Sequence, residues 1–137
     1  MEYTFTPAGF ASDRNRDALL IDFASVDRKS IPQLIEDKRG HDDCFDWSGH
    51  IAIEGRVWVV ARTYDVLRVD RHKKGPVDVR VPERIQHRHQ LDGWVTIVRE
   101  DVTTRYRTVN FSDPEEVFLV PESIDSVILV RGGLQST

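Results

Sequence analysis

The sequence contains a single cysteine, Cys44, among its 137 residues, so no disulfide can form within the chain. Long apolar stretches are also missing. The longest run, Val57–Ala61, is far too short to span a bilayer, and no transmembrane segment is expected. The chain does not open with a basic start followed by an apolar region, so no signal peptide is expected in it.

An excess of positive charge is missing as well. The chain has 19 Lys and Arg residues against 23 Asp and Glu residues, a formal net charge of −4, so no nucleic-acid partner is expected. Its 39% apolar and 31% charged residues are close to ordinary globular values and exclude bulk disorder. No group of residues indicates a reaction or a cofactor, so we expect neither an enzyme nor a bound cofactor.

From His50 onward the sequence is rich in β-branched and aromatic residues, with Gly, Pro, Asp or Asn between short runs of them. Short connections at 73–76 and 100–101 favour antiparallel hairpins. We therefore expect a mainly β (α+β) fold, a single curved antiparallel sheet or half-open β-barrel with one or two short helices. The expected strands are 51–54, 57–62, 66–70, 77–81, 94–99, 103–109, 117–120 and 127–131.

The N-terminal third is less regular. One short helix is expected over 31–39, because Ser30 and Gln33 match a capping box, Pro32 falls in the first turn and Gly40 follows as a stop. The other expected segments are a short strand at 2–6, a surface loop at 7–17, a strand at 18–24 and a loop at 82–91. Together they predict one domain, 1–137, in which an irregular segment (1–49) precedes a β meander (50–131) and a flexible tail (132–137).

Three of the expected strands carry apolar residues on both faces, namely Val57–Ala61, Trp94–Val98 and Val127–Val130. Such strands are typical of the centre of a sheet that is covered on both sides. We therefore expect a helix or a loop over one concave side of the sheet. That concavity is either filled as an ordinary core or open to an apolar ligand, and the sequence leaves both alternatives open.

Two stretches resemble a known family. Residues 55–69, GRVWVVARTYDVLRV, are similar to a hairpin in which a Gly-x-x-Trp strand, a Thr-containing turn and a strand with a Leu-Arg pair follow one another. Residues 104–124, TRYRTVNFSDPEEVFLVPESI, are similar to a strand that leads through an Asp-Pro turn into a Leu-x-Pro-x-Ser strand end. Over 50–131 the chain thus resembles the outer-membrane lipoprotein carrier (LolA/LolB-like) superfamily domain of exported bacterial proteins.

This resemblance implies a half-open barrel whose apolar concave face binds a lipid, an acyl chain or another apolar group outside the cytoplasm. We therefore expect a non-enzymatic binding module in the periplasm or in another exported location, and the chain itself is expected to be a fragment of a larger exported protein. Two alternatives stay open: a protein–protein interaction domain with a filled core, and a small metal-dependent hydrolase.

Large apolar side chains on the expected strands are the candidates for lining such a concavity. They are Trp58, Val60, Trp94, Tyr106 and Phe118. Burial of apolar ligand surface against them is the expected source of affinity.

A possible face for an anionic partner is formed by Arg99, Arg105 and Arg107, with Tyr106 between the last two. The alternative is a solvated strand face whose arginines pair with Asp and Glu across the ladder.

The pair His87 and His89 would share one face of an extended segment and is the weak candidate for a zinc site. Its spacing matches no established metal motif, so the sequence predicts no metal site and favours a polar loop there.

Overall fold

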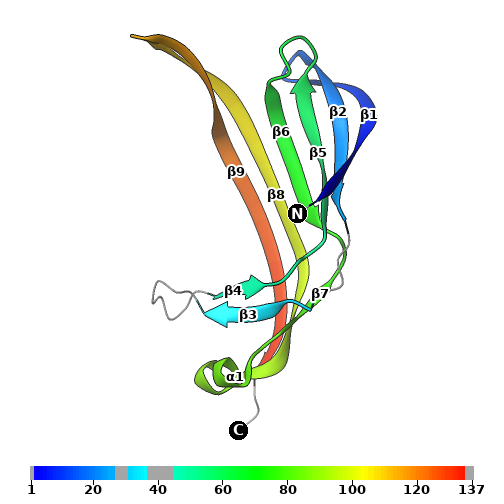
Figure 1. Cartoon of the computed structure of the whole chain (residues 1–137), viewed down its shortest axis with the longest axis vertical. Coiled ribbons are helices and arrows are strands. Elements are labelled where there is room, and N and C mark those ends of the chain that lie inside the picture. Colours follow the sequence, from blue (N-terminus) through cyan, green and yellow to red (C-terminus); the bar gives the residue numbers. More distant parts are fainter. Residues whose placement is uncertain (1, 27–30, 37–44, 135–137) are drawn as a thin grey trace. The chain divides into compact units, whose positions relative to one another are not determined.

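The computed structural model describes residues 2–26, 31–36 and 45–134, and strands make up most of them (Figure 1). The elements, in chain order, are β1 (Tyr3–Asp13), β2 (Arg16–Ser25), β3 (Gln33–Glu36), β4 (Phe45–Ser48), β5 (Ile53–Val60), β6 (Val66–Lys73), β7 (Val77–Arg80), α1 (Glu83–His89), β8 (Leu91–Ser112) and β9 (Glu115–Leu134). The expected fold class, mainly β with a short helix, is confirmed.

The nine strands form one hydrogen-bonded sheet in the order β1-β2-β5-β6-β8-β7-β3-β4, and β9 pairs with β8. β6 and β7 both pair with β8, at successive segments of it: β6 pairs with residues 101–105 and β7 with residues 94–97. β3 and β7 are parallel where Gln33 meets Arg80. Since β1 and β4 end the order and do not pair with each other, the described sheet is open and not a closed barrel.

The chain divides into two compact units that interleave in the sequence. Unit 1 comprises residues 1–26, 53–72 and 101–127, and unit 2 comprises residues 27–52, 73–100 and 128–137. β8 and β9 each contribute one portion to unit 1 and the other portion to unit 2.

Unit 1 begins with the long β1–β2 hairpin, so the surface loop expected over 7–17 is wrong. Pro7 and Gly9 lie at a register shift inside β1, and Gly9 has φ 102°. Bulges of this kind accommodate the two residue types that usually interrupt strands. The hairpin turn itself is Arg14-Asn15, with φ of 50° and 64°, as the twist of a two-residue turn demands. The strand expected over 18–24 is confirmed within β2.

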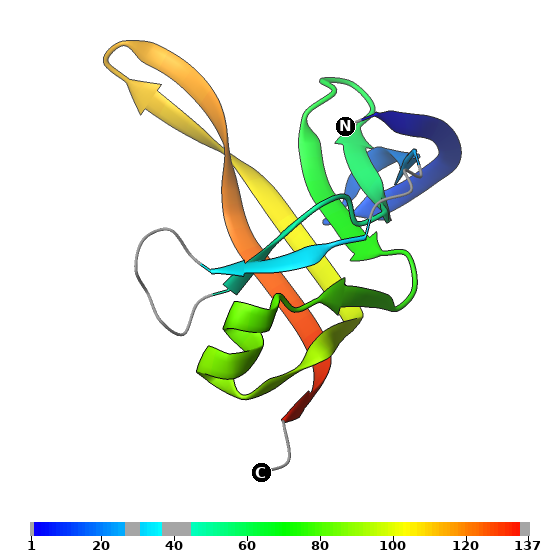
Figure 2. The ribbon, with the colours of Figure 1, turned by 60° about the horizontal axis from the view of Figure 1, so that its bottom comes forward.

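Unit 2 contains the hydrophobic core, a cluster to which β3, β7, β8 and α1 all contribute (Figure 2). Its buried members are Leu34, Ile51, Val79, Val81, Ile85 and Ile97. The loop expected over 82–91 is wrong, because Glu83–His89 forms α1 and packs Ile85 into this core. α1 ends at Gln90, whose left-handed conformation (φ 55°) allows the chain to turn into β8.

The helix expected over 31–39 is wrong where the structure describes it. Gln33–Glu36 is strand β3, which pairs with β4 and meets β7. Leu34 is buried in the core while Gln33 is exposed, an alternation that suits a strand. Tertiary pairing has therefore overridden the local capping pattern. Residues 37–39 of the expected helix, and Cys44, lie outside the described residues.

β8 and β9 are longer than the sequence predicts. Each joins two of the expected strands into one strand, of 22 residues in β8 and 20 residues in β9. The expected connection at 100–101 is wrong, because Asp101 lies in the ladder opposite His72. The flexible tail expected over 132–137 is wrong for 132–134, which belong to β9.

Candidate functional site

An apolar groove lies within unit 2, beside the core. Its volume is about 390 Å³, at the lower end of the range for small-molecule sites. β3 and β4 contribute one wall, and β7, β8 and β9 contribute the floor and the other wall. The lining residues are Leu34, Trp47, Val79, Leu91, Val95, Ile97, Ile128, Val130 and Gly132.

The curl of the sheet inside unit 2 makes this groove. β4 and β9 stand at opposite ends of the strand order β9-β8-β7-β3-β4, yet Trp47 of β4 and Val130 of β9 line the same groove. The groove is closed over β7 and β8, where Val79 and Ile97 are almost fully buried, and open along β9, where Ile128 and Val130 are 51% and 48% exposed.

The lining gives the groove a simple chemistry. No charged side chain is among the lining residues, and their exposed surface is nearly all carbon. Such a surface cannot orient a polar substrate or move a proton, but it can bury a hydrocarbon chain or an apolar side chain. Gly132 extends the floor of the groove, since a Cβ there would lie 3.4 Å from a methyl group of Val95.

None of the five side chains expected to line a concavity lies in this groove. Trp58 and Val60 are on β5, and Tyr106 and Phe118 are in the unit 1 portions of β8 and β9. Trp94 belongs to unit 2, but it is 51% exposed and lines a different hollow, beside the N-terminal half of α1.

The unit 1 members of that set also lie apart from one another. Trp58 lines a hollow on the face of β1, β2, β5 and β6, and the guanidinium carbon of Arg68 is 4.5 Å from the centroid of its ring. Tyr106 lines a second hollow, next to Arg107. Phe118 is exposed on β9 and meets Phe111 edge to face, with ring centroids 5.5 Å apart.

The hollow beside Trp58 has a volume of about 450 Å³ and is lined by ion pairs. Arg56 donates two hydrogen bonds to the carboxylate of Asp22, at 2.6 and 3.1 Å, and His72 lies 2.9 Å from Glu54. Asp22 has a lowered pKa, chiefly because it accepts these hydrogen bonds from Arg56. Arg56 and Asp22 thus match opposite charges directly across β5 and β2 on this face.

The three arginines expected to form an anionic-partner face are divided between the units. Arg105 and Arg107 are in unit 1 and Arg99 is in unit 2. Arg105 forms an ion pair with Asp13 at 3.6 Å, and the charges of Arg107 and Arg105 contribute to the lowered pKa of Glu122. These two arginines thus face carboxylates.

The two histidines His87 and His89 lie on α1 and not on an extended segment. Residues two apart on a helix point to different faces, so the structure does not bring the two imidazoles together. His87 lies 3.7 Å from Glu83, one helical turn earlier. Among the described residues no three His, Cys, Asp or Glu side chains are grouped so as to hold a metal ion.

Sequence reasoning missed the groove, although some of its signal was present. Alternate apolar residues at Val77, Val79 and Val81, and at Val95 and Ile97, mark the buried face of β7 and β8. The walls from β3 and β4 left no such signal, because each strand has only four residues.

Within the described portion of the chain, no helix has the length and apolarity needed to cross a membrane. Comparisons of the chain with models of known protein families, with curated proteins and with solved structures found no match.

Proposed function

We propose that this protein is a non-enzymatic binding module whose unit 2 groove holds an apolar chain, such as the acyl chain of a lipid. The observation that carries the proposal is the open groove along β9, in which half-exposed Ile128 and Val130 face a lining without charged side chains. The resemblance of residues 50–131 to lipoprotein carrier domains supports the same ligand class.

Binding would be driven by removal of apolar surface from water. Each 100 Å² of ligand surface buried in the groove is worth roughly 2.5 kcal/mol before ordering costs. Because the lining holds no charge, a lipid head group would stay outside the groove and affinity would depend on the chain. Chains that differ in length should therefore differ in affinity, while chains that differ only in head group should not.

The test is titration of the protein with a fluorescent fatty acid whose emission rises in an apolar site. The native chain should give saturable one-to-one binding. Gly132→Leu places an isobutyl group on the groove floor next to Val95, so it should weaken probe binding at least tenfold. Absence of saturable binding by the native chain would refute the proposal.

A matched control adds the same side chain one residue away. Successive side chains of a strand point to opposite faces, so Arg131→Leu introduces leucine into β9 without filling the groove. Probe affinity of Arg131→Leu should equal that of the native chain. Equal loss in both variants would mean that the probe does not bind in the groove.

We extend the proposal to location, because the domains that this chain resembles work outside the cytoplasm. The full-length protein should be found in the periplasmic or another exported fraction of its native cell. Recovery in the cytosolic fraction alone would contradict a role like that of the lipoprotein carriers. The apolar groove would then need a separate explanation.

A protein-interaction role is favoured by a separate feature, the exposed strand β9. A ligand groove requires apolar side chains on only one face of β9, but β9 carries them on both faces. Leu129, for example, does not line the groove and is still 54% exposed. Contiguous exposed apolar surface of this kind marks protein–protein contacts.

A further inference from the structure

The hollow that Tyr106 lines in unit 1 differs from the apolar groove in its charge. Its volume is about 310 Å³, and residues of the β1–β2 turn and of the unit 1 portions of β6 and β8 line it. They are Asp13, Arg14, Arg16, Leu67, Tyr106, Arg107 and Thr108. Three arginines thus line the hollow beside a single carboxylate, although the whole chain has a net charge of −4.

Contacts join this hollow to two further charged residues of unit 1. Arg105 forms an ion pair with Asp13 at 3.6 Å, and Arg14 donates a hydrogen bond of 2.6 Å to Glu122. We call the resulting group the arginine cluster. Its members are Asp13, Arg14, Arg16, Arg105, Arg107 and Glu122. Four arginines against two carboxylates leave the cluster with an excess of two positive charges.

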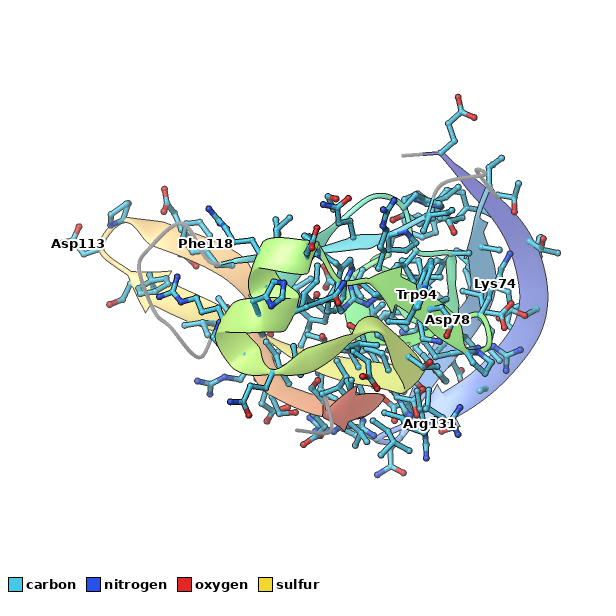
Figure 3. All side chains as sticks on the ribbon, turned by 90° about the horizontal axis from the view of Figure 1, so that it is seen from below. Lys74, Asp78, Trp94, Asp113, Phe118 and Arg131 are labelled. Carbon is cyan, nitrogen blue, oxygen red and sulfur yellow. The ribbon has the colours of Figure 1, made fainter. Side chains whose placement is uncertain are left out.

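Two arginines of the cluster carry this excess. Arg16 and Arg107 are exposed, and neither forms an ion pair or a hydrogen bond with a carboxylate among the residues that the structure describes. Asp113, Glu115 and Glu116 lie at or next to the β8–β9 turn, where Figure 3 shows Asp113, and none of them lines the hollow. An anion that enters the hollow would therefore meet guanidinium groups with unused hydrogen-bond donors.

Glu122 shows how this cluster acts on an oxyanion. Its pKa is lowered, chiefly by the hydrogen bond from Arg14 and further by the charges of Arg14, Arg107 and Arg105. Positive charges that stabilise this carboxylate also stabilise another oxyanion placed among them. A phosphate suits arginine especially well, because the guanidinium fork can donate two parallel hydrogen bonds to two phosphate oxygens.

The backbone of the β1–β2 turn supports a role for Arg14 beyond the turn itself. Arg14 and Asn15 have φ of 50° and 64°, and a two-residue turn of this kind usually carries Asn, Asp or Gly at its first position. An arginine there is in a sparsely populated conformation, and residues held in this way are enriched at ligand sites. The side chain of Arg14, and not its backbone, is therefore the feature that suits this position.

We propose that the arginine cluster binds the phosphate group of a phosphate monoester. Such a group carries about −1.5 to −2 charges at neutral pH, which matches the excess of two positive charges. A carboxylate or a sulfate ester carries one charge and would leave half of the excess unmatched. Leu67 and Tyr106 line the same hollow and offer apolar surface to the organic part of the ester. The site lies in unit 1 and the apolar groove in unit 2, so neither proposal depends on the other.

The first test is isothermal titration calorimetry of the full chain with phenyl phosphate, at about pH 8, where the ester is dianionic. The native chain should give saturable one-to-one binding. Phenyl sulfate has nearly the same shape but a single negative charge, so it should bind at least tenfold more weakly. Absence of saturable phenyl phosphate binding overturns the proposal, and equal affinity for the two esters overturns the assignment to phosphate.

Substitution of the two arginines without an ion pair locates the site. Arg16→Gln and Arg107→Gln each remove one guanidinium from the hollow and should weaken phenyl phosphate binding roughly tenfold. Arg71→Gln is the matched control, because Arg71 is an exposed arginine on β6 of unit 1 that does not line the hollow. Its affinity should equal that of the native chain. Equal loss in all three variants would mean that the ester responds only to net charge, and it overturns the site.

A lipid can also present a phosphate monoester, as the head group of phosphatidic acid. Cosedimentation compares vesicles of phosphatidylcholine with vesicles in which part of the lipid is phosphatidic acid. If the protein binds only the second kind, and Arg16→Gln and Arg107→Gln lose this binding, the cluster recognises a lipid head group. If phenyl phosphate binds and the two kinds of vesicle do not differ, the cluster recognises a soluble ester.

Glu122→Gln tests the part that Arg14 plays in the site. The substitution removes the carboxylate that competes with phosphate for the guanidinium of Arg14, so phenyl phosphate affinity should rise severalfold. A gain of affinity cannot come from a variant that fails to fold. Affinity that stays the same or falls in Glu122→Gln overturns the assignment of Arg14 to the site.

Discussion

The guanidinium of Arg14 donates a hydrogen bond of 2.6 Å to the carboxylate of Glu122, across 108 residues of sequence. This contact joins the β1–β2 turn of unit 1 to the middle of β9. Arg14 makes it from a left-handed backbone conformation, φ 50°, which few residues other than Gly, Asn and Asp adopt readily. The sharp turn thus brings the charge of Arg14 to a strand that β1 and β2 do not pair with.

Glu122→Gln should lower the stability of unit 1 slightly at neutral pH. The pKa of Glu122 is lowered, chiefly by the hydrogen bond from Arg14, so its contribution is present above the ordinary value of 4.5 and is lost as pH falls through the lowered pKa. Urea denaturation of the two proteins at several pH values measures the difference. The gap between them should close in acid, and a gap that widened there would contradict this assignment.

Lys73→Met should stabilise unit 2 by about 1 kcal/mol at neutral pH. Lys73 is only 6% exposed, and its Nζ has no hydrogen-bond partner among the residues that the structure describes. Burial lowers its pKa, and the charge of Glu100 opposes this only in part. Methionine has a similar length and carries no charge to bury. Thermal denaturation of both proteins measures the change, and a lower midpoint for Lys73→Met would contradict it.

The pH dependence of the same substitution has a definite sign. Because the folded pKa of Lys73 lies below its ordinary value of 10.5, the unfolded chain binds more protons between the two values, and native stability rises with pH there. The advantage of Lys73→Met should therefore be largest below the folded pKa and should shrink as pH approaches 10.5. An advantage that is constant with pH would mean that charge burial is not its cause.

The sequence predicts several of the strands but not the short elements α1 and β3. The enrichment in β-branched and aromatic residues predicts the strands at 77–81 and 94–99, and these correspond to β7 and to part of β8. α1 was missed because it has seven residues and buries only Ile85, so no helical periodicity can develop. β3 was misread because a matching capping pattern precedes it, while its pairing with β4 and β7 is not visible in local sequence.

The candidate site was harder to predict for a topological reason. Residues 127–130 are apolar on both faces, and such a run is typical of a strand at the centre of a sheet. In the structure this run lies on the edge strand β9, so the same pattern means an exposed surface and not a covered core. Whether a strand is central or at an edge depends on distant pairings, which neither composition nor periodicity records.

Gly55→Ala should destabilise unit 1 by about 3 kcal/mol. A Cβ at Gly55 would overlap the carbonyl oxygen of Asp70 and the ring of Phe23, and neither the backbone nor the packed ring can move away cheaply. Gly132→Ala is the matched control, since its Cβ would meet Val95 at 3.4 Å, an ordinary contact. Chemical denaturation followed by circular dichroism compares the two variants. Equal stability of the two variants would contradict the close packing at Gly55.

Truncation of two isoleucines, Ile97→Ala and Ile128→Ala, should distinguish a residue of the hydrophobic core of unit 2 from a residue at the open side of its groove. Ile97 is 2% exposed and belongs to the buried cluster, so its truncation should cost about 3 kcal/mol through lost burial and a residual cavity. Ile128 is 51% exposed at the open side of the groove, and its truncation should cost less than about 1 kcal/mol. The same Ile128→Ala variant should weaken the binding of an apolar probe, because it removes a section of the groove wall. Equilibrium unfolding and probe titration of both variants measure the two effects. If Ile128→Ala loses as much stability as Ile97→Ala, the groove is part of the core and not a binding site.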